Sequence, residues 1–290
     1  MVLHCRETRS YRHPNFIWAE LMQPFEVQIW RATPSQIDPS QWAEWVALLD
    51  SSEQAQCLRF RFDADRHAYT LAHALRRLAL GQVLDCDPCS LSFSHDSRGK
   101  PALHAPAGAE ISFSHSHTRD EAVFALSFDA LIGVDVETIR ADGADLGILN
   151  DFLVSPGALP IAGHTLSGAG AVEQFYFYWT ALEAFWKAEG SGLSASNPRI
   201  RCEQNEPGWF EISLENATRP DPRAWLVPLH GRPGSSACLA VKNRLTGVST
   251  RAATGSRPTS IRSGEQTQFL KFKKRALRSL CSKVTTIVPS

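Results

Sequence analysis

Two acidic residues lie one position apart in the segment "IGVDVE", where they are Asp135 and Glu137. On a strand, residues two positions apart point to the same face, so both carboxylates would leave one side of the sheet while Val134 and Val136 point to the other. Carboxylates this close repel each other unless a cation lies between them, and oxygen ligands of this kind suit Mg²⁺. The alternative interpretation is a solvent-facing strand edge without a metal.

A third acid and a lysine lie four positions apart in "FYFYWTALEAFWKAEGSGL", residues 175–193. If this stretch is helical, Glu183 and Lys187 share one face. A surface ion pair of this spacing would contribute only about 0.3–0.5 kcal/mol. A carboxylate and an ammonium are also what a phosphoryl-transfer site needs, because one binds metal or accepts a proton and the other neutralises a leaving phosphate.

The elements that must position these residues are read from apolar periodicity and turn residues. In chain order we predict a strand over 25–33, helices over 38–50 and 65–84 (the second ending near Gly81), short strands from residue 91, an irregular bridge over 141–171 with at most a short helix around 145–153, a helix over 175–190, and four further strands. This order fits two α+β halves better than a βαβαβ array.

Four motifs in the same order resemble those of the 4′-phosphopantetheinyl transferase superfamily. "GVDVE" followed by "WTALEAFWKAEGSGL" looks like its paired signature. "RGKPAL" at 98–103, "ISFSHSH" at 111–117 and the helix "DRHAYTLAHALRRLAL" are similar to further family segments. The resemblance covers residues 55–193.

The resemblance implies an enzyme that moves the phosphopantetheine arm of coenzyme A to a serine of an apo carrier protein from a fatty-acid, polyketide or non-ribosomal peptide synthase, with release of 3′,5′-ADP. It also implies the larger, Sfp-like type, an α+β monomer of two similar halves related by a pseudo-two-fold axis, with the active site in the cleft between them. We expect an irregular segment over 1–24, halves over 25–130 and 131–244, and a basic, disordered tail over 245–290.

Carried over residue by residue, the resemblance implies that Asp135, Glu137 and Glu183 hold Mg²⁺. Glu183 would also take the proton of the carrier serine, directly or through a metal-bound water. Lys187 would stabilise or protonate the departing phosphate.

The same resemblance implies how coenzyme A is bound. Lys100 would meet the 3′-phosphate or adenine end, and Ser114 and His115 would donate hydrogen bonds to the phosphates. A single histidine near a strand end is more often structural, so the binding role of His115 depends on the resemblance alone.

Two departures from the family pattern remove positive charge. Leu182 stands where relatives usually have lysine, and Ala68 stands where they commonly have arginine. Arg59, Arg61 and Arg66 lie nearby in sequence and are the candidates to replace the missing charges. The alternative function is therefore a homologue that binds coenzyme A with reduced or lost transfer.

The composition indicates the class of protein and the compartment in which we expect it. The chain has 290 residues, 43% of them hydrophobic and 21% charged. No apolar run is long enough to span a membrane and the N-terminus has no secretory pattern, so we expect a cytoplasmic protein without membrane contact. Seven scattered cysteines indicate free thiols rather than a disulfide framework.

The charge is unevenly distributed. Residues 245–290 contain nine Lys or Arg and one acid. The favoured interpretation is a solvated or vestigial tail. The tail could instead attract acidic carrier proteins by charge, and a nucleic-acid arm is the remaining interpretation. We do not expect nucleic-acid binding, because no aromatic interleaving accompanies the basic residues.

Overall fold

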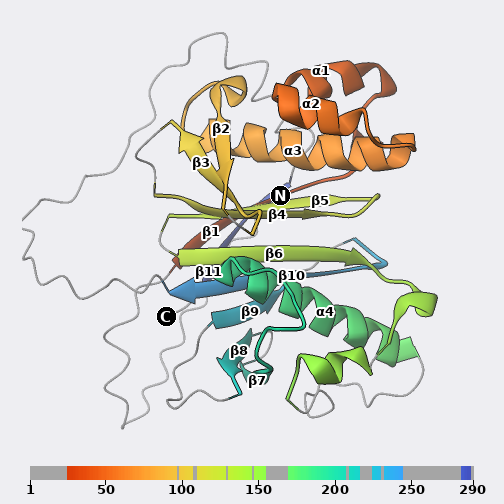
Figure 1. Ribbon diagram of the computed structural model, residues 1–290, viewed down its shortest axis with the longest axis vertical. Coiled ribbons are helices and arrows are strands. Elements are labelled where there is room, and N and C mark those ends of the chain that lie inside the picture. Colours follow the sequence, from red (N-terminus) through yellow and green to blue (C-terminus); the bar gives the residue numbers. More distant parts are fainter. Residues whose placement is uncertain are drawn as a thin grey trace, which may run out of the picture.

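The computed structural model describes residues 25–96, 98–106, 110–128, 130–145, 147–154, 169–206, 209–215, 224–229, 232–243 and 282–288. In these residues two antiparallel sheets lie against each other, and helices cover the outer face of each sheet (Figure 1). The molecule has the α+β fold that the sequence predicts.

The strands form two main sheets and one hairpin. The first sheet has the order β11–β1–β5–β4, the second has the order β6–β10–β9–β8–β7, and β2 pairs with β3. Their bounds are β1 (Phe25–Ala32), β2 (Ser92–His95), β3 (Pro101–Ala105), β4 (Ser112–His117), β5 (Ala122–Ser127), β6 (Ala130–Thr138), β7 (Ile200–Glu206), β8 (Trp209–Leu214), β9 (Ala224–Pro228), β10 (Ser235–Asn243) and β11 (Ser282–Val288).

The helices include four α-helices and several short 3-10 turns, labelled η, in the described residues. Their bounds are η2 (Pro34–Gln36), η3 (Pro39–Gln41), α1 (Trp42–Ala47), α2 (Ser51–Cys57), α3 (Asp63–Val83), η4 (Pro88–Ser90), η5 (Ala141–Gly143), η6 (Ile148–Asp151) and α4 (Ala169–Glu189).

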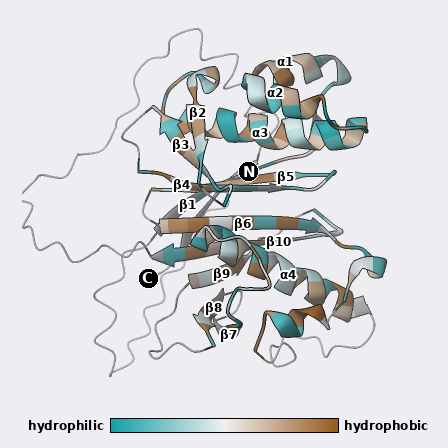
Figure 2. Cartoon of the chain, viewed as in Figure 1, coloured by the Kyte–Doolittle hydropathy of each residue, from teal (hydrophilic) through white to brown (hydrophobic). Residues whose placement is uncertain are grey.

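Three hydrophobic cores lie between these layers. One lies between α1–α3 and the first sheet, the second lies between the two sheets, and the third lies between the second sheet and α4. Strand β5 is buried along its whole length, because α3 covers one face and the second sheet covers the other. Figure 2 shows hydrophobic residues along β6, in the middle of the stack.

Burial on both faces also explains the order of apolar and polar residues along strand β1. Val27 and Ile29 point between the sheets, while Trp30 points toward the helices, with its ring 5.6 Å from that of Phe124. A simple alternation of apolar and polar residues is therefore interrupted at Trp30, since both faces of this strand pack against other layers.

The two halves share one feature, a 21-residue helix on each sheet, α3 on the first and α4 on the second. The sheets differ in strand number and order. Their pseudo-two-fold relation and the division at residues 130 and 131 stay predictions.

Helix boundaries differ from the predicted ones in places. The segment 38–50 is shorter as a helix, with η3 preceding α1, although Asp38 accepts the expected hydrogen bond from the nitrogen of Ser40. Helix α4 begins at residue 169, inside the bridge predicted to be irregular. Helix α2 was not predicted, despite its capping box between Asp50 and Glu53.

The predicted disordered tail is wrong for residues 282–288. These residues form β11, which pairs antiparallel with β1. The segment "SKVTTIV" is rich in β-branched residues, which favour strands, and β1 offers a free edge for pairing. The predicted irregular segment 1–24 lies outside the described residues.

Within the described residues, no helix combines the length and hydrophobicity needed to cross a membrane. The cysteines of this part of the chain, Cys57, Cys86, Cys89, Cys202 and Cys238, are free thiols, as predicted.

Candidate active site

Helix α4 packs directly on strand β6 at Gly133. A Cβ atom at this position would lie 2.0 Å from the carbonyl oxygen of Ala184 and 2.5 Å from the nitrogen of Ala188. Cβ atoms essentially never come closer than 3.0 Å to another heavy atom, so this contact requires glycine. The close approach places the last turns of α4, with Lys187, over the acidic residues of β6.

Asp135 lies on the same face of β6 and is 3% exposed. Its Oδ1 accepts hydrogen bonds from Nζ of Lys187 at 2.6 Å and from Oγ of Ser116 at 2.8 Å. Nζ of Lys187 also donates to Oγ of Ser116 at 3.3 Å. Side chains from β4, β6 and α4 thus meet at one carboxylate.

Glu137 and Glu183 are half-buried and interact with Asp135 through charge. Burial and the charge of Asp135 raise the pKa of Glu137 to about 7, although Lys187 opposes the shift. Burial and Asp135 also raise the pKa of Glu183. The three acids therefore repel one another, as expected from their shared location.

The described residues contain no group of three His, Cys, Asp or Glu side chains gathered closely enough to hold a metal ion. The cation at Asp135 in this structure is the ammonium of Lys187. Even so, the types of ligand suit a hard divalent cation, because three carboxylates interact through charge here. Among the described residues, Oδ2 of Asp135 is buried and has no hydrogen-bond partner. A cation would satisfy that oxygen and relieve the repulsion, so the residues fit Mg²⁺ in their chemistry.

A row of serines on β4 joins the two sheets. Oγ of Ser112 accepts a hydrogen bond from the nitrogen of Ile132, and Oγ of Ser114 accepts one from the nitrogen of Val134, both at 3.0 Å. A hydroxyl that accepts in this way still has a proton to donate. Ser114 can thus accept a hydrogen bond from β6 and donate one to a ligand at the same time.

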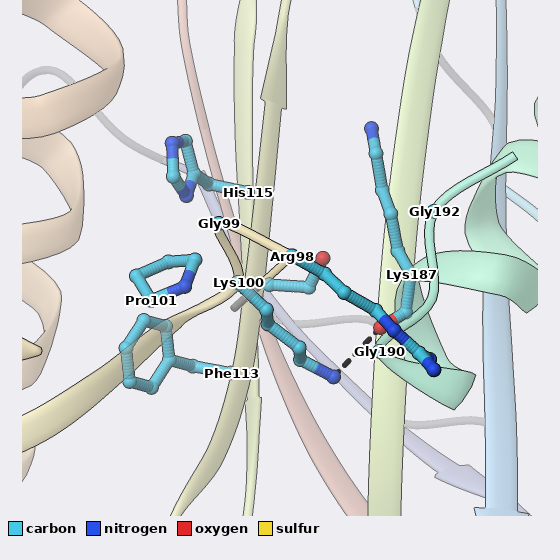
Figure 3. Close-up of a pocket in the computed structure, with 10 residues that line it drawn as sticks. Arg98, Gly99, Lys100, Pro101, Phe113, His115, Lys187, Gly190 and Gly192 are labelled. Atoms are coloured by element: carbon cyan, nitrogen blue, oxygen red, sulfur yellow. Dashed lines mark hydrogen bonds between the residues drawn. The ribbon is translucent and has the colours of Figure 1, made fainter. Parts of the chain in front are cut away.

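A cavity of about 200 Å³ adjoins Lys187 and is lined by residues of both halves (Figure 3). The lining consists of Arg98, Gly99, Lys100, Pro101, Phe113, Ser114, His115, Lys187, Gly190 and Gly192. Arginine and lysine give this cavity a positive character that suits anionic ligands. Burial and the charge of Arg76 hold the pKa of His115 well below its ordinary value, so this imidazole is neutral and retains one N–H donor.

Lys100 links the β2–β3 hairpin to the C-terminal end of α4. Its Nζ donates to the carbonyl oxygen of Lys187 at 2.6 Å and to that of Ala188 at 3.4 Å (Figure 3). Carbonyls in the last turn of a helix lack helical donors, and Lys100 supplies one. The turn before Lys100 contains Gly99 with φ of 83°, a conformation that favours glycine.

Two predicted phosphate-binding arginines do not line the cavity. Arg59 bonds to the side chain of Gln56, and Arg66 pairs with Asp63 and the carbonyl oxygen of Phe60, all within the α2–α3 region. Arg98 lines the cavity instead. Its position in "RGKPAL", two residues before Lys100, was the signal that could have identified it.

Ser116 is a second residue that the sequence analysis did not assign. It follows Ser112 and Ser114 at alternate positions of "SFSHSH", so all three point to the same side of β4. That spacing predicts a shared face. It does not reveal Asp135 and Lys187 as partners, because both come from other elements.

The two departures from the family pattern lie in the protein interior. Leu182 is 0% exposed in the core between α4 and the second sheet. Ala68 is 3% exposed on α3. Neither residue is among those that line the cavity beside Lys187, and a weakening of phosphate binding by these two substitutions stays a prediction.

Comparisons with known proteins match this chain to one family. Residues 30–128 match the model of the N-terminal region of 4′-phosphopantetheinyl transferases. The chain is 32% identical over 198 residues to the 4′-phosphopantetheinyl transferase HetI of Nostoc sp., an alignment that covers 65% of this chain and 82% of HetI.

Other relatives have related names. A phosphopantetheinyl transferase of Thraustochytrium sp. is 27% identical, with 60% of this chain and 64% of that protein covered. The 4′-phosphopantetheinyl transferase Sfp of Bacillus subtilis is 24% identical, with 61% of this chain and 75% of Sfp covered.

Proposed function

The chain belongs to the 4′-phosphopantetheinyl transferase family, and on this premise we propose that it transfers the 4′-phosphopantetheine group of coenzyme A to a serine of an apo carrier protein, with Mg²⁺, and releases 3′,5′-ADP. The observation that carries the proposal is the contact between Asp135 and Lys187 at the edge of a basic cavity, with Glu137 and Glu183 beside it. Acids for a metal and cations for phosphates are the components of phosphoryl transfer.

Asp135, Glu137 and Glu183 would hold Mg²⁺ together with the pyrophosphate of coenzyme A. When bound, the metal ion withdraws charge from the phosphate oxygens and makes the phosphorus easier to attack. The buried, unpartnered Oδ2 of Asp135 supports this assignment, as does the raised pKa of the two glutamates.

Glu183 would accept the proton of the attacking serine. Its raised pKa makes the carboxylate a stronger base than an exposed glutamate. As the serine oxygen forms its bond to phosphorus, the bond from phosphorus to the 3′,5′-ADP oxygen breaks, and the serine proton moves to Glu183.

Lys187 would stabilise the negative charge that develops on 3′,5′-ADP. Its ammonium is held by Asp135 and Ser116, and its side chain keeps 30% exposure at the cavity. A fixed cation stabilises developing charge without reorganising during the reaction.

The phosphates of coenzyme A would bind in the cavity through Lys100, Ser114, His115 and Arg98. Arg98 is added to the proposal because it lines the cavity, and the binding of coenzyme A by Arg59 and Arg66 stays a prediction. The described residues of one chain supply both sides of the cavity, which supports a monomer as the working unit.

The proposal is tested with the full chain, Mg²⁺, coenzyme A and a panel of apo carriers from fatty-acid, polyketide and non-ribosomal peptide synthases. Intact-mass spectrometry should show that at least one carrier gains a single phosphopantetheine. Glu183→Gln should abolish the gain, whereas Glu173→Gln, an exposed position on the same helix, should leave it intact.

If no carrier gains mass with the wild-type chain, the transfer proposal fails. Calorimetric titration with coenzyme A then decides whether the chain is a binding homologue without transfer.

A further inference from the structure

The serines of β4 make two different kinds of contact with the other half of the molecule. Ser112 and Ser114 accept hydrogen bonds from backbone nitrogens of β6. Ser116 instead donates to the carboxylate of Asp135 and accepts from the ammonium of Lys187. Only the third member of this row therefore contacts two charged side chains of the site.

The position of Ser116 ties together groups that no single element could align. Asp135 belongs to β6, Lys187 belongs to α4, and Ser116 comes from the other sheet. With Lys187 and Ser116 both on Oδ1, that oxygen accepts two hydrogen bonds while Oδ2 has none. The hydroxyl thus fixes the orientation of the carboxylate, and the buried second oxygen is left without a hydrogen bond in the described part of the chain.

We infer that Ser116 is a positioning residue, which holds the Asp135 carboxylate and the Lys187 ammonium in the relative orientation that the reaction requires. Its kinetic consequence rests on the proposed transfer function. The side chain acts through Asp135 and Lys187, so it should affect turnover more than coenzyme A binding.

The kinetic test compares Ser116→Ala with Ser112→Ala. Both variants remove a hydroxyl that bridges the same two strands, but the hydroxyl of Ser112 accepts its hydrogen bond from the backbone nitrogen of Ile132 rather than from a charged side chain. Ser116→Ala should lower kcat about 10-fold with the KM for coenzyme A changed less than about twofold, because the hydrogen bonds to two charged groups are lost. Ser112→Ala should keep the wild-type kcat, and Ser116→Thr, which retains the hydroxyl, should recover most of the activity.

Two kinetic outcomes overturn the inference. One is a rise in KM for coenzyme A with kcat unchanged in Ser116→Ala, since that indicates a ligand contact. The other is an equal loss of kcat in both alanine variants, in proportion to their loss of Tm, since that indicates a purely structural role. If Ser116→Ala does not fold, Ser116→Cys and Ser116→Thr give the same comparison. Cysteine is close to serine in size but hydrogen-bonds weakly, whereas threonine keeps the hydroxyl and adds a methyl group.

A second readout does not require transfer. Thermal unfolding of Ser116→Ala, Asp135→Asn and the double variant should give changes in Tm that are not additive, because the two side chains are in contact. The matched cycle with Ser112→Ala should be additive. Additive changes for Ser116 and Asp135 refute the inference even if the wild-type chain transfers nothing, whereas absence of transfer alone refutes the proposed function.

Discussion

Lys187 and Asp135 form an ion pair between helix α4 and strand β6, with Nζ and Oδ1 2.6 Å apart. The lysine is partly exposed at the cavity and the aspartate is buried. The pair therefore connects the interior of the second half with the space where a phosphate would bind.

Replacing Lys187 with methionine should lower kcat by about 10²–10³, since a fixed donor for developing negative charge is lost. Steady-state kinetics with coenzyme A and an apo carrier measure the change. Lys242→Met is the matched control, because Lys242 pairs with Glu189 at the same 2.6 Å near the end of α4 and does not line the cavity. A similar loss in both variants would contradict the role of Lys187 in the reaction.

Gly133→Ala should move α4 away from β6. The new methyl group would meet main-chain atoms of Ala184 and Ala188, which cannot turn aside as a flexible side chain could. We expect a loss of about 1–3 kcal/mol in the free energy of unfolding, measured by urea denaturation, and a fall in transfer.

Gly170→Ala is the control for that prediction. Gly170 also lies in α4, and nothing lies within 4 Å of a Cβ atom at this position. Alanine there should leave stability unchanged or raise it by up to about 1 kcal/mol. Equal effects at the two glycines would show that the contact at Gly133 is not what limits the substitution.

Leu182→Lys should destabilise the protein without improving transfer. The side chain is fully buried among apolar residues, so an ammonium there would be desolvated. We expect the free energy of unfolding to fall by about 3 kcal/mol or more. Leu182→Met should cost less than about 1.5 kcal/mol. Thermal unfolding and the carrier assay measure both effects, and a stable Leu182→Lys variant with faster transfer would show that this side chain reaches the site.

Lys100→Met should weaken both coenzyme A binding and the fold, because Lys100 lines the cavity and holds the end of α4. Calorimetry should show lower affinity for coenzyme A, and thermal unfolding should show a lower Tm. Arg98→Met should lower the affinity with little change in Tm, since Arg98 is an exposed residue of the same turn. If Lys100→Met leaves Tm unchanged, its bond to α4 contributes nothing to stability.

Glu53 should make the stability of the fold depend on pH in the acidic range. Burial would raise the pKa of Glu53, but the hydrogen bond from His73 and the charge of Arg76 lower it to about 2. Because the folded-state pKa lies below the ordinary value, the ionised carboxylate stabilises the fold above about pH 4.5 and loses this effect as pH falls toward 2.

The test is the Tm of Glu53→Gln from pH 7 to pH 2. At pH 7 the free energy of unfolding of the variant should be about 3–5 kcal/mol lower than that of the wild type, since Arg76 and Arg77 lose their buried partner. The difference from wild type should shrink as pH falls below about 4.5. Glu44→Gln, an exposed residue of α1, should show no such change, and a constant difference for Glu53→Gln at every pH would contradict the assignment.

Features that depend on local periodicity and on short motifs could be predicted from the amino-acid sequence. Alternation along a strand put Asp135 and Glu137 on one face, and helical spacing put Glu183 and Lys187 on one face, because these periods follow from backbone geometry. The ordered motifs indicated the family, and the element pattern predicted the α+β class.

Which of these faces meet depends on long-range packing and could not be predicted from local patterns. Ser116, Asp135 and Lys187 come from three elements, and Lys100 reaches the end of α4 across a long stretch of sequence. The burial of Leu182 and the pairing of β11 with β1 also depend on partners distant in the chain. A periodic pattern determines the direction of a side chain relative to its own strand or helix, but long-range packing determines what that side chain contacts.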